Sequence, residues 1–220
     1  MVYILPFLAV ILGVGIAYVV KPNSPKGMKL ILSFSGAFLL GVLILEMLPG
    51  IYQAVNPTSG GLILLGILIQ KLLEFLSKGA EHGHTHKHSQ QQLPWVLLLS
   101  LCVHAFLEGL PLGLQPKLLW AISIHKITIG LVLGLLLFQT QNSGASKMGA
   151  LLVFALMSPI GSFVGEYIPI PLLRTWIDPL VAGVLIHIST TILFETSEGH
   201  EFNLQKFLSI FLGMVLAILL

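Results

Sequence analysis

Long apolar segments separated by short polar breaks constrain this chain more than any other feature of its sequence. A helix that crosses the hydrocarbon core of a bilayer needs roughly 20 apolar residues. Only 9% of the residues are charged, against about 25% in soluble domains, so the chain cannot cover a water-facing surface. The sequence predicts an all-α membrane protein, an eight-transmembrane-helix bundle with spans 3–20, 28–48, 60–77, 94–113, 119–138, 147–168, 178–197 and 205–220.

The breaks between these segments contain turn residues, as in KPNSPKG and QNSGAS, and none is long enough for a second domain. We expect one transmembrane domain over residues 1–220. The run Met1 to Val20 has no preceding basic residue and no following small-residue cleavage site, so it is interpreted as a retained span rather than a signal peptide.

The distribution of Lys and Arg predicts the orientation, because inner loops carry an excess of these residues. With the N-terminus outside, the inner connections hold Lys21, Lys26, Lys29, Lys78, Lys87, Lys147 and Lys206. The outer connections then hold only Lys117 and Arg174. We therefore expect a multi-pass protein of the cell membrane with both termini outside.

The connection at about 78–93 is polar and rich in histidine, with His82, His84, His86 and His88 at alternate positions. Such a tract cannot bury enough apolar area to fold alone. Its imidazoles are suited to transient capture or sensing of zinc-like ions on the cytoplasmic side. The alternative is a solvated loop without a role.

Composition also excludes several classes of function. The net charge of +2 and the lack of a basic cluster argue against nucleic-acid binding. Cys102 is the single cysteine and lies in an apolar run, so neither a disulfide framework nor a cysteine metal site is available. A metal site in this chain must use histidine and carboxylate ligands.

Ionisable residues inside apolar segments are costly and usually face a partner or a water-filled path. Lys71 and Glu74 are three apart and are interpreted as a pair on one helix. His187 is interpreted first as a hydrogen-bonding group between helices, with a peripheral metal role as the alternative. Glu46, near the end of the second span, has either an interfacial role or a role in metal entry at the outer mouth.

A repeated motif, H-x4-G-L-x-L-G, places two further histidines in adjacent spans. It begins at His104 and again, 21 positions later, at His125. Glu108 follows His104 by four residues and therefore shares its helix face, whereas the second copy has Ile129 at the equivalent position. Counting 1.5 Å per residue from the intervening turn puts each histidine roughly 13–18 Å deep, near the membrane midplane.

Small-xxx-small glycine pairs in both copies allow close helix approach: Gly109 with Gly113, and Gly130 with Gly134. Pro111 lacks a backbone donor and is expected to open the fourth helix just beyond Glu108. Two imidazoles and a carboxylate suit a borderline divalent ion such as zinc. The alternative is a set of satisfied hydrogen bonds between helices.

These motifs resemble those of the ZIP (Zrt/Irt-like) family of divalent-metal transporters. HAFLEGLPLGL is similar to the family's fourth-segment signature, and HKITIGLVLG to the branch whose fifth segment begins His-Lys. MSPIGSFVGE resembles the sixth segment and LVAGVLIHIS the glycine-rich seventh. The resemblance implies transport of zinc, iron or related ions toward the cytoplasm, with ligands His104, Glu108 and His125.

The chain departs from many relatives at several positions. It has Ala105 where many have Asn or Ser, Thr128 and Ile129 where many have a proline and a second carboxylate, and His187 where tyrosine is common. Without that second carboxylate we expect one ion rather than two. Lys126 is then expected to replace the charge of a second metal and to hold Glu108 ionised, the alternative being a lysine paired elsewhere.

The sequence therefore predicts a non-enzymatic carrier that works by alternating access, with Zn²⁺ or a similar ion as transported substrate and no cofactor. Divalent ions, membrane lipids and a second copy of the chain in a homodimer are the expected partners. An intramembrane zinc hydrolase is one alternative, although the H-E-x-x-H motif is absent. A metal sensor or channel-like pore is the other.

Overall fold

The computed structural model describes residues 1–20, 25–53, 57–77, 95–195 and 204–220, and every regular element in these ranges is helical. The helices are α1 (Ile4–Val20), α2 (Pro25–Val42), α3 (Leu48–Gln53), α4 (Ser59–Ser77), α5 (Trp95–Gly109), α6 (Pro116–Gln139), α7 (Gly144–Glu166), α8 (Ile170–Leu172), α9 (Asp178–Glu195) and α10 (Leu204–Leu219). Short π-helical turns, Leu43–Met47 and Leu173–Ile177, join α2 to α3 and α8 to α9.

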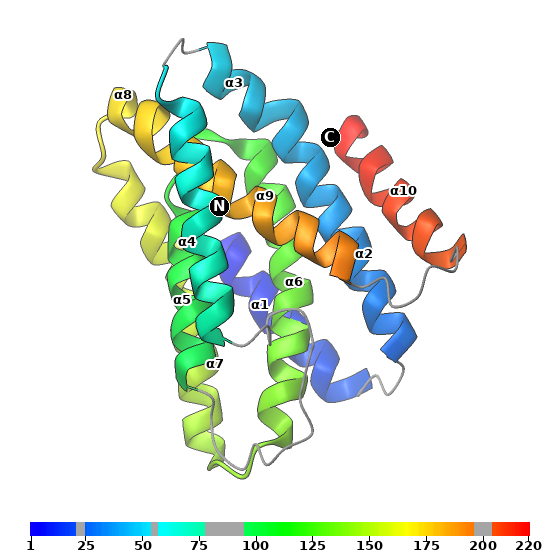
Figure 1. Ribbon diagram of the computed structural model, residues 1–220. Helices are drawn as coiled ribbons and strands as arrows, with labels where there is room; N and C mark the ends of the chain where they lie inside the picture. Colours follow the sequence, from blue (N-terminus) through cyan, green and yellow to red (C-terminus); the bar gives the residue numbers. More distant parts are fainter. Residues whose placement is uncertain (21–24, 54–56, 78–94, 196–203) are drawn as a thin grey trace.

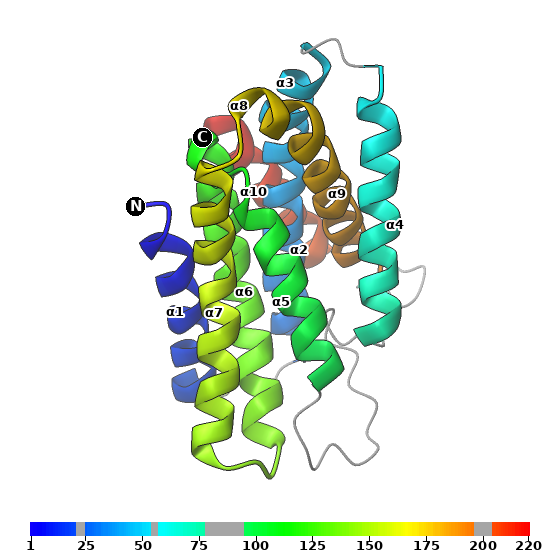
Figure 2. The same cartoon turned by 90° about the vertical axis from the view of Figure 1, so that its left-hand side faces the viewer.

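The long helices stand roughly side by side and run alternately up and down, so that α3 and α8 lie together at one end (Figures 1 and 2). The turn between α6 and α7 lies at the opposite end (Figure 2). Both chain termini lie in the same upper part of this view. This alternation follows from the short breaks seen in the sequence, because a short connection between two spans forces them to be antiparallel.

Within the described ranges, six helices are long and apolar enough to cross a membrane, and each overlaps one of the eight predicted spans. The other two predicted spans correspond to shorter apolar helices, Ile4–Val20 and Leu204–Leu219. The all-α membrane class is confirmed by these helices. The histidine-rich tract 78–93 lies outside the described residues.

The helix ends follow local chemistry. Ser143 caps α7, its side chain accepting a hydrogen bond from the Ser146 backbone N–H at 3.2 Å. Pro116 occupies the first turn of α6, where its missing N–H costs nothing. The helix carrying Glu108 ends at Gly109, two residues before Pro111, and a 3₁₀ turn follows at Leu112–Leu114. The expected opening beyond Glu108 is therefore observed.

Buried glycines bring particular helices into backbone contact. A Cβ atom on Gly130 would meet the backbone of Val10 in α1, and one on Gly109 would meet the backbone of Ser158 and Gly161 in α7. Gly134 also contacts α1, but Gly113 has nothing within 4 Å of its Cβ position. The expectation of close approach is confirmed for Gly109, Gly130 and Gly134 and is wrong for Gly113, which lies beyond the end of α5.

The glycine contacts join the helices in pairs, and buried apolar residues of α1, α5, α6 and α7 form one shared core that unites two of these pairs. In the first bundle, defined as α1, α5, α6 and α7, the glycine contacts join α1 to α6 and α5 to α7. In the second bundle, defined as α2, α4, α9 and α10, Gly66 and Gly183 join α4 to α9, and Gly213 joins α10 to α2. The most extensive helix contacts follow the same pairs, whereas α5 and α6 pack chiefly on other helices rather than on each other.

Replacing Gly161 by alanine tests this packing. The new methyl group would collide with the Phe106 carbonyl oxygen and with Gly109, and overpacking of this kind costs about 1–3 kcal/mol. We expect a lower melting temperature in detergent. The control is Gly149→Ala on the same helix, where the methyl group has nothing within 4 Å and alanine is the better helix former. Equal melting temperatures for the two variants would contradict the packing argument.

Candidate metal site

His104 and Glu108 project from the same face of α5, as their spacing predicts. The His104 Nε2 atom lies 3.2 Å from Glu108 Oε2. Both side chains are buried, with exposed fractions of 3% and 0%. A buried carboxylate is costly unless it is paired and hydrogen-bonded, so the groups around Glu108 decide whether this arrangement is stable.

His125 on α6 completes a cluster with these two residues. Its ring centroid is 6.4 Å from that of His104, with the ring planes nearly perpendicular. One ligand atom from each of His104, Glu108 and His125 lies within 4.8 Å of the other two. Ligand atoms on one tetrahedral zinc ion are about 3.4 Å apart, given bond lengths near 2.1 Å. The cluster is therefore close to the size of an ion's ligand shell and slightly wider.

Lys126 approaches Glu108 from α6. Its ammonium forms an ion pair with Glu108 Oε1, and the lysine side chain is almost fully buried. The Nζ atom also lies 4.6 Å from the centre of the Phe154 ring on α7. Both contacts favour the ammonium, the first by charge pairing and the second by a cation–π interaction. Glu108 therefore has a fixed counter-ion from the protein itself.

Two serines from other helices hydrogen-bond to the cluster. The Ser158 hydroxyl of α7 lies 2.9 Å from the Ala105 carbonyl oxygen and 3.3 Å from Glu108 Oε1. The Ser35 hydroxyl of α2 lies 3.3 Å from His125 Nδ1. Neither serine was among the residues predicted from the sequence to belong to the site. Ser158 lies in the MSPIGSFVGE motif, just before Pro159, and this position could have marked it as a candidate site residue. Ser35 belongs to no motif and differs from its neighbours only as a hydroxyl inside an apolar segment.

Some polar atoms of the cluster have no hydrogen-bond partner among the described residues. They include His104 Nδ1, His104 Nε2 and Glu108 Oε2. The 3.2 Å approach of His104 Nε2 to Glu108 Oε2 thus meets the distance of an ion pair but not the geometry of a hydrogen bond. Buried polar atoms without partners cost free energy. Imidazole nitrogens and a carboxylate oxygen left without hydrogen-bond partners fit the coordination of a cation better than a set of satisfied helix–helix hydrogen bonds.

The cluster borders a small cavity of about 10 Å³, close to the space that one water molecule needs. Its walls combine both bundles: Leu101, His104, His125, Lys126 and Ile129 on one side, and Ile188 and Ile192 on the other. The cavity is too small to serve as an open aqueous path. The cluster is thus enclosed by side chains in this structure.

A larger cavity of about 410 Å³ lies at the end of the molecule that carries α3 and α8. Glu46, in the π-helical turn after α2, lines it and forms an ion pair of 2.6 Å with Lys117. Asp178 also lines it, and its Oδ2 atom accepts a hydrogen bond of 3.1 Å from Gln115. Glu46 therefore does not join the three-residue cluster but borders a separate mouth.

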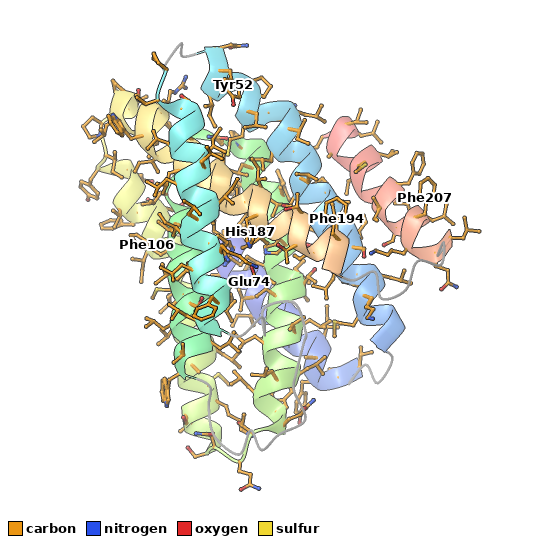
Figure 3. The ribbon with its side chains drawn as sticks, viewed as in Figure 1. Tyr52, Glu74, Phe106, His187, Phe194 and Phe207 are labelled. Atoms are coloured by element: carbon orange, nitrogen blue, oxygen red, sulfur yellow. The ribbon has the colours of Figure 1, made fainter. Side chains whose placement is uncertain are left out.

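His187 and Glu74 form a second polar contact where α9 crosses α4 (Figure 3). His187 Nε2 is 2.6 Å from Glu74 Oε2, and Lys71 Nζ is 3.1 Å from the same oxygen. Both interpretations from the sequence are confirmed: Lys71 pairs with Glu74, and His187 bonds between helices. The sequence did not indicate that Glu74 serves both. His82, His84, His86 and His88 lie outside the described residues.

Lys126→Met provides a test of the counter-ion. Methionine keeps the length of the side chain but leaves Glu108 as a buried charge without its ammonium, which costs about 3–5 kcal/mol. We expect a clear fall in the melting temperature of the purified protein in chelator. The double variant Lys126→Met/Glu108→Gln removes the charge as well and should recover most of the loss. A single variant as stable as the wild type would contradict the pairing.

Comparison with known proteins agrees with these features. The family model for the ZIP zinc transporters matches residues 74–220, which is more than half of the chain. Zinc transporter ZIP1 of Takifugu rubripes is 32% identical over 150 residues, covering 59% of this chain and 48% of the relative. Zinc transporter ZIP2 of Homo sapiens is 38% identical over 93 residues, covering 38% and 30%.

Protein zntD of Dictyostelium discoideum is 28% identical over 150 residues, covering 57% of this chain and 22% of the relative. The matched part spans less than half of the length of each of these three relatives. The resemblance inferred from the motifs of the fourth to seventh segments is confirmed by the family match. The chain belongs to the ZIP family of zinc transporters.

Proposed function

We propose that the protein carries a divalent transition-metal ion, zinc first, across a cell membrane toward the cytoplasm. The observation that carries this proposal is the buried cluster of His104, Glu108 and His125, whose ligand atoms lie within 4.8 Å of one another. Polar atoms without hydrogen-bond partners in this cluster support an ion as the missing partner. The names of the relatives support the same class of substrate.

Histidine and carboxylate ligands suit a carrier. They bind zinc, iron(II), cobalt and similar ions, with the affinity set mainly by the ion. A closed thiolate cage would hold zinc too tightly for release, whereas this ligand set can exchange its ion. The ion is substrate rather than cofactor. The family match also favours transport over the hydrolase alternative, which lacks the H-E-x-x-H motif.

One ion per chain is the stoichiometry that the charges support. Lys126 pairs with Glu108 Oε1, so a second dication would have to share a carboxylate that the ammonium and the first ion already use. Two like charges sharing one buried carboxylate repel strongly in a low-dielectric interior. Lys126 therefore acts as a fixed substitute for a second ion.

Eight spans with both termini outside are the topology that we propose. The helices alternate in direction, and α1 and α10, although shorter than the other spans, are apolar. In that orientation Lys29, Lys147 and Lys206, near the starts of α2, α7 and α10, lie on the cytoplasmic side. A homodimer in the membrane stays a prediction.

The peripheral residues receive roles that follow from their positions. Glu46 borders the mouth at the α3–α8 end and is proposed to attract cations on entry. Its pair with the exposed Lys117 is weak enough to exchange for an arriving ion. The histidines 82–88 are proposed to collect ions on the cytoplasmic side. His187 is proposed to be structural, since Glu74 already engages it.

Uptake into proteoliposomes tests the three-residue site. His104→Ala and Glu108→Ala should each abolish zinc uptake, because two ligands cannot replace three in an enclosed site. The matched control is His187→Ala, a membrane histidine outside the cluster, which should retain uptake. Circular dichroism and gel filtration would verify that the variants fold. Normal uptake by His104→Ala would remove the site from consideration.

Calorimetric titration of the purified protein tests the stoichiometry. In a variant with His82, His84, His86 and His88 replaced by serine, one zinc ion per chain is expected. His125→Ala added to that variant should remove this binding. Two ions per chain, both lost with His125→Ala, would contradict a single-ion site.

A further inference from the structure

The three proposed ligands all belong to the first bundle. His104 and Glu108 lie on α5 and His125 lies on α6. Glycine contacts join α5 to α7 and α6 to α1, and a shared apolar core holds these two pairs together as the first bundle. Any movement that opens the enclosed site must separate surfaces, and among the described glycines none makes a close contact across the boundary between the bundles.

Polar contacts cross this boundary at three levels. At the α3–α8 end, Lys117 pairs with Glu46, and Gln115 donates to Asp178. Toward the opposite end, the Ser100 hydroxyl of α5 donates to the Leu73 carbonyl oxygen of α4 at 2.8 Å. Between them, Ser35 of α2 meets His125 of α6. This central contact alone among the four includes a proposed ligand.

Ser35 is placed to respond to an ion on His125. It is 99% buried, and its hydroxyl reaches Nδ1 of the ring, which leaves Nε2 as the nitrogen for an ion. A metal-bound imidazole carries its proton on the other nitrogen and donates it to an outer partner. An ion at Nε2 therefore fixes Nδ1–H as a donor to Ser35 Oγ and strengthens that hydrogen bond.

We propose that Ser35 is a positioning residue that links ion occupancy to the relative position of the two bundles. The ion-loaded imidazole bonds across the boundary to α2 and holds the site enclosed. Loss of the ion weakens the bond and releases α6 from α2. This inference rests on the proposed function, since it takes His125 as a ligand. Beyond that function, it assigns Ser35, a residue of the second bundle, a role in orienting His125.

Ser158 provides a matched comparison. Its hydroxyl contacts Glu108, another proposed ligand, but α7 and α5 belong to the same bundle. Removing Ser158 should therefore weaken ion binding without freeing the boundary. Removing Ser35 should do both. Outer hydrogen bonds to metal ligands typically change affinity roughly 10- to 100-fold, and one hydrogen bond changes a conformational equilibrium roughly 2- to 10-fold.

The substitution Val132→Cys places a thiol at the boundary, where its reactivity can be measured. Val132 of α6 packs against Leu32, Ile188 and Ile192 of the second bundle. It is seven residues from His125, about 10 Å along the helix, so a thiol there does not join the ligand cluster. In a Cys102→Ser background, which removes the single native cysteine, the rate of modification by a charged thiol reagent measures how often the boundary opens.

Saturating zinc should slow this modification in the wild-type background. With Ser35→Ala, modification in saturating zinc should be roughly 2- to 10-fold faster, and Ser35→Thr, which keeps the hydroxyl, should restore the protection. Ser158→Ala should bind zinc more weakly but keep full protection at saturation. Calorimetry on each variant would fix the zinc concentration that saturates it.

The contrary outcomes separate a failure of the proposed role of Ser35 from a failure of the proposed function. Full zinc protection in Ser35→Ala, or equal loss of protection in Ser158→Ala, would overturn the role of Ser35 and leave the proposed function intact. Absence of zinc binding in the wild-type background would overturn the proposed function itself, and the link with it.

Discussion

The carboxylate of Glu108 is the constraint on which the rest of the structure depends. It is fully buried in a membrane-spanning helix, where an isolated charge is unstable. The ammonium of Lys126 balances it, Ser158 lies within hydrogen-bond distance of it, and the imidazole of His104 approaches it. These groups come from three helices, so the positions of α5, α6 and α7 are fixed relative to one another around a single negative charge.

Glycine determines how those helices can reach their positions. Contacts at Gly109 and Gly161 bring α5 against α7, and the contact at Gly130 brings α6 against α1. The three-residue cluster thus lies between two helix pairs, α5 with α7 and α6 with α1, whose buried apolar residues form one core. Glycine contacts join α4 to α9 and α10 to α2 in the same way. We propose movement at the boundary between the two bundles, across which none of the described glycines makes a close contact.

The helix positions and the three clustered side chains could be predicted from the sequence. Hydropathy and turn residues gave helix positions to within a few residues, because a bilayer-spanning segment has a nearly fixed length. The four-residue spacing of His104 and Glu108, with His125 at matched depth, predicted which side chains would meet. Both inferences rest on span length and helix periodicity, and these can be worked out from the order of residues alone.

The partners from distant helices could not be predicted. Ser35 and Phe154 reach the cluster only because of how α2 and α7 pack, and no local pattern encodes that packing. The glycines of the fourth and fifth segments contact α7 and α1, and their spacing did not identify these neighbours. Sequence patterns indicate that a glycine permits close approach but do not identify the neighbouring helix.

Phe154 has a consequence for how charge is exchanged at the cluster. A dication arriving at Glu108 and the resident ammonium of Lys126 both require the same carboxylate, and neither can move into lipid at low cost. The aromatic face of Phe154 offers the ammonium a second attractive surface that carries no net charge. In the proposed site, the lysine therefore stays beside the carboxylate when one ion binds, and the ring offsets part of the repulsion between the two cations.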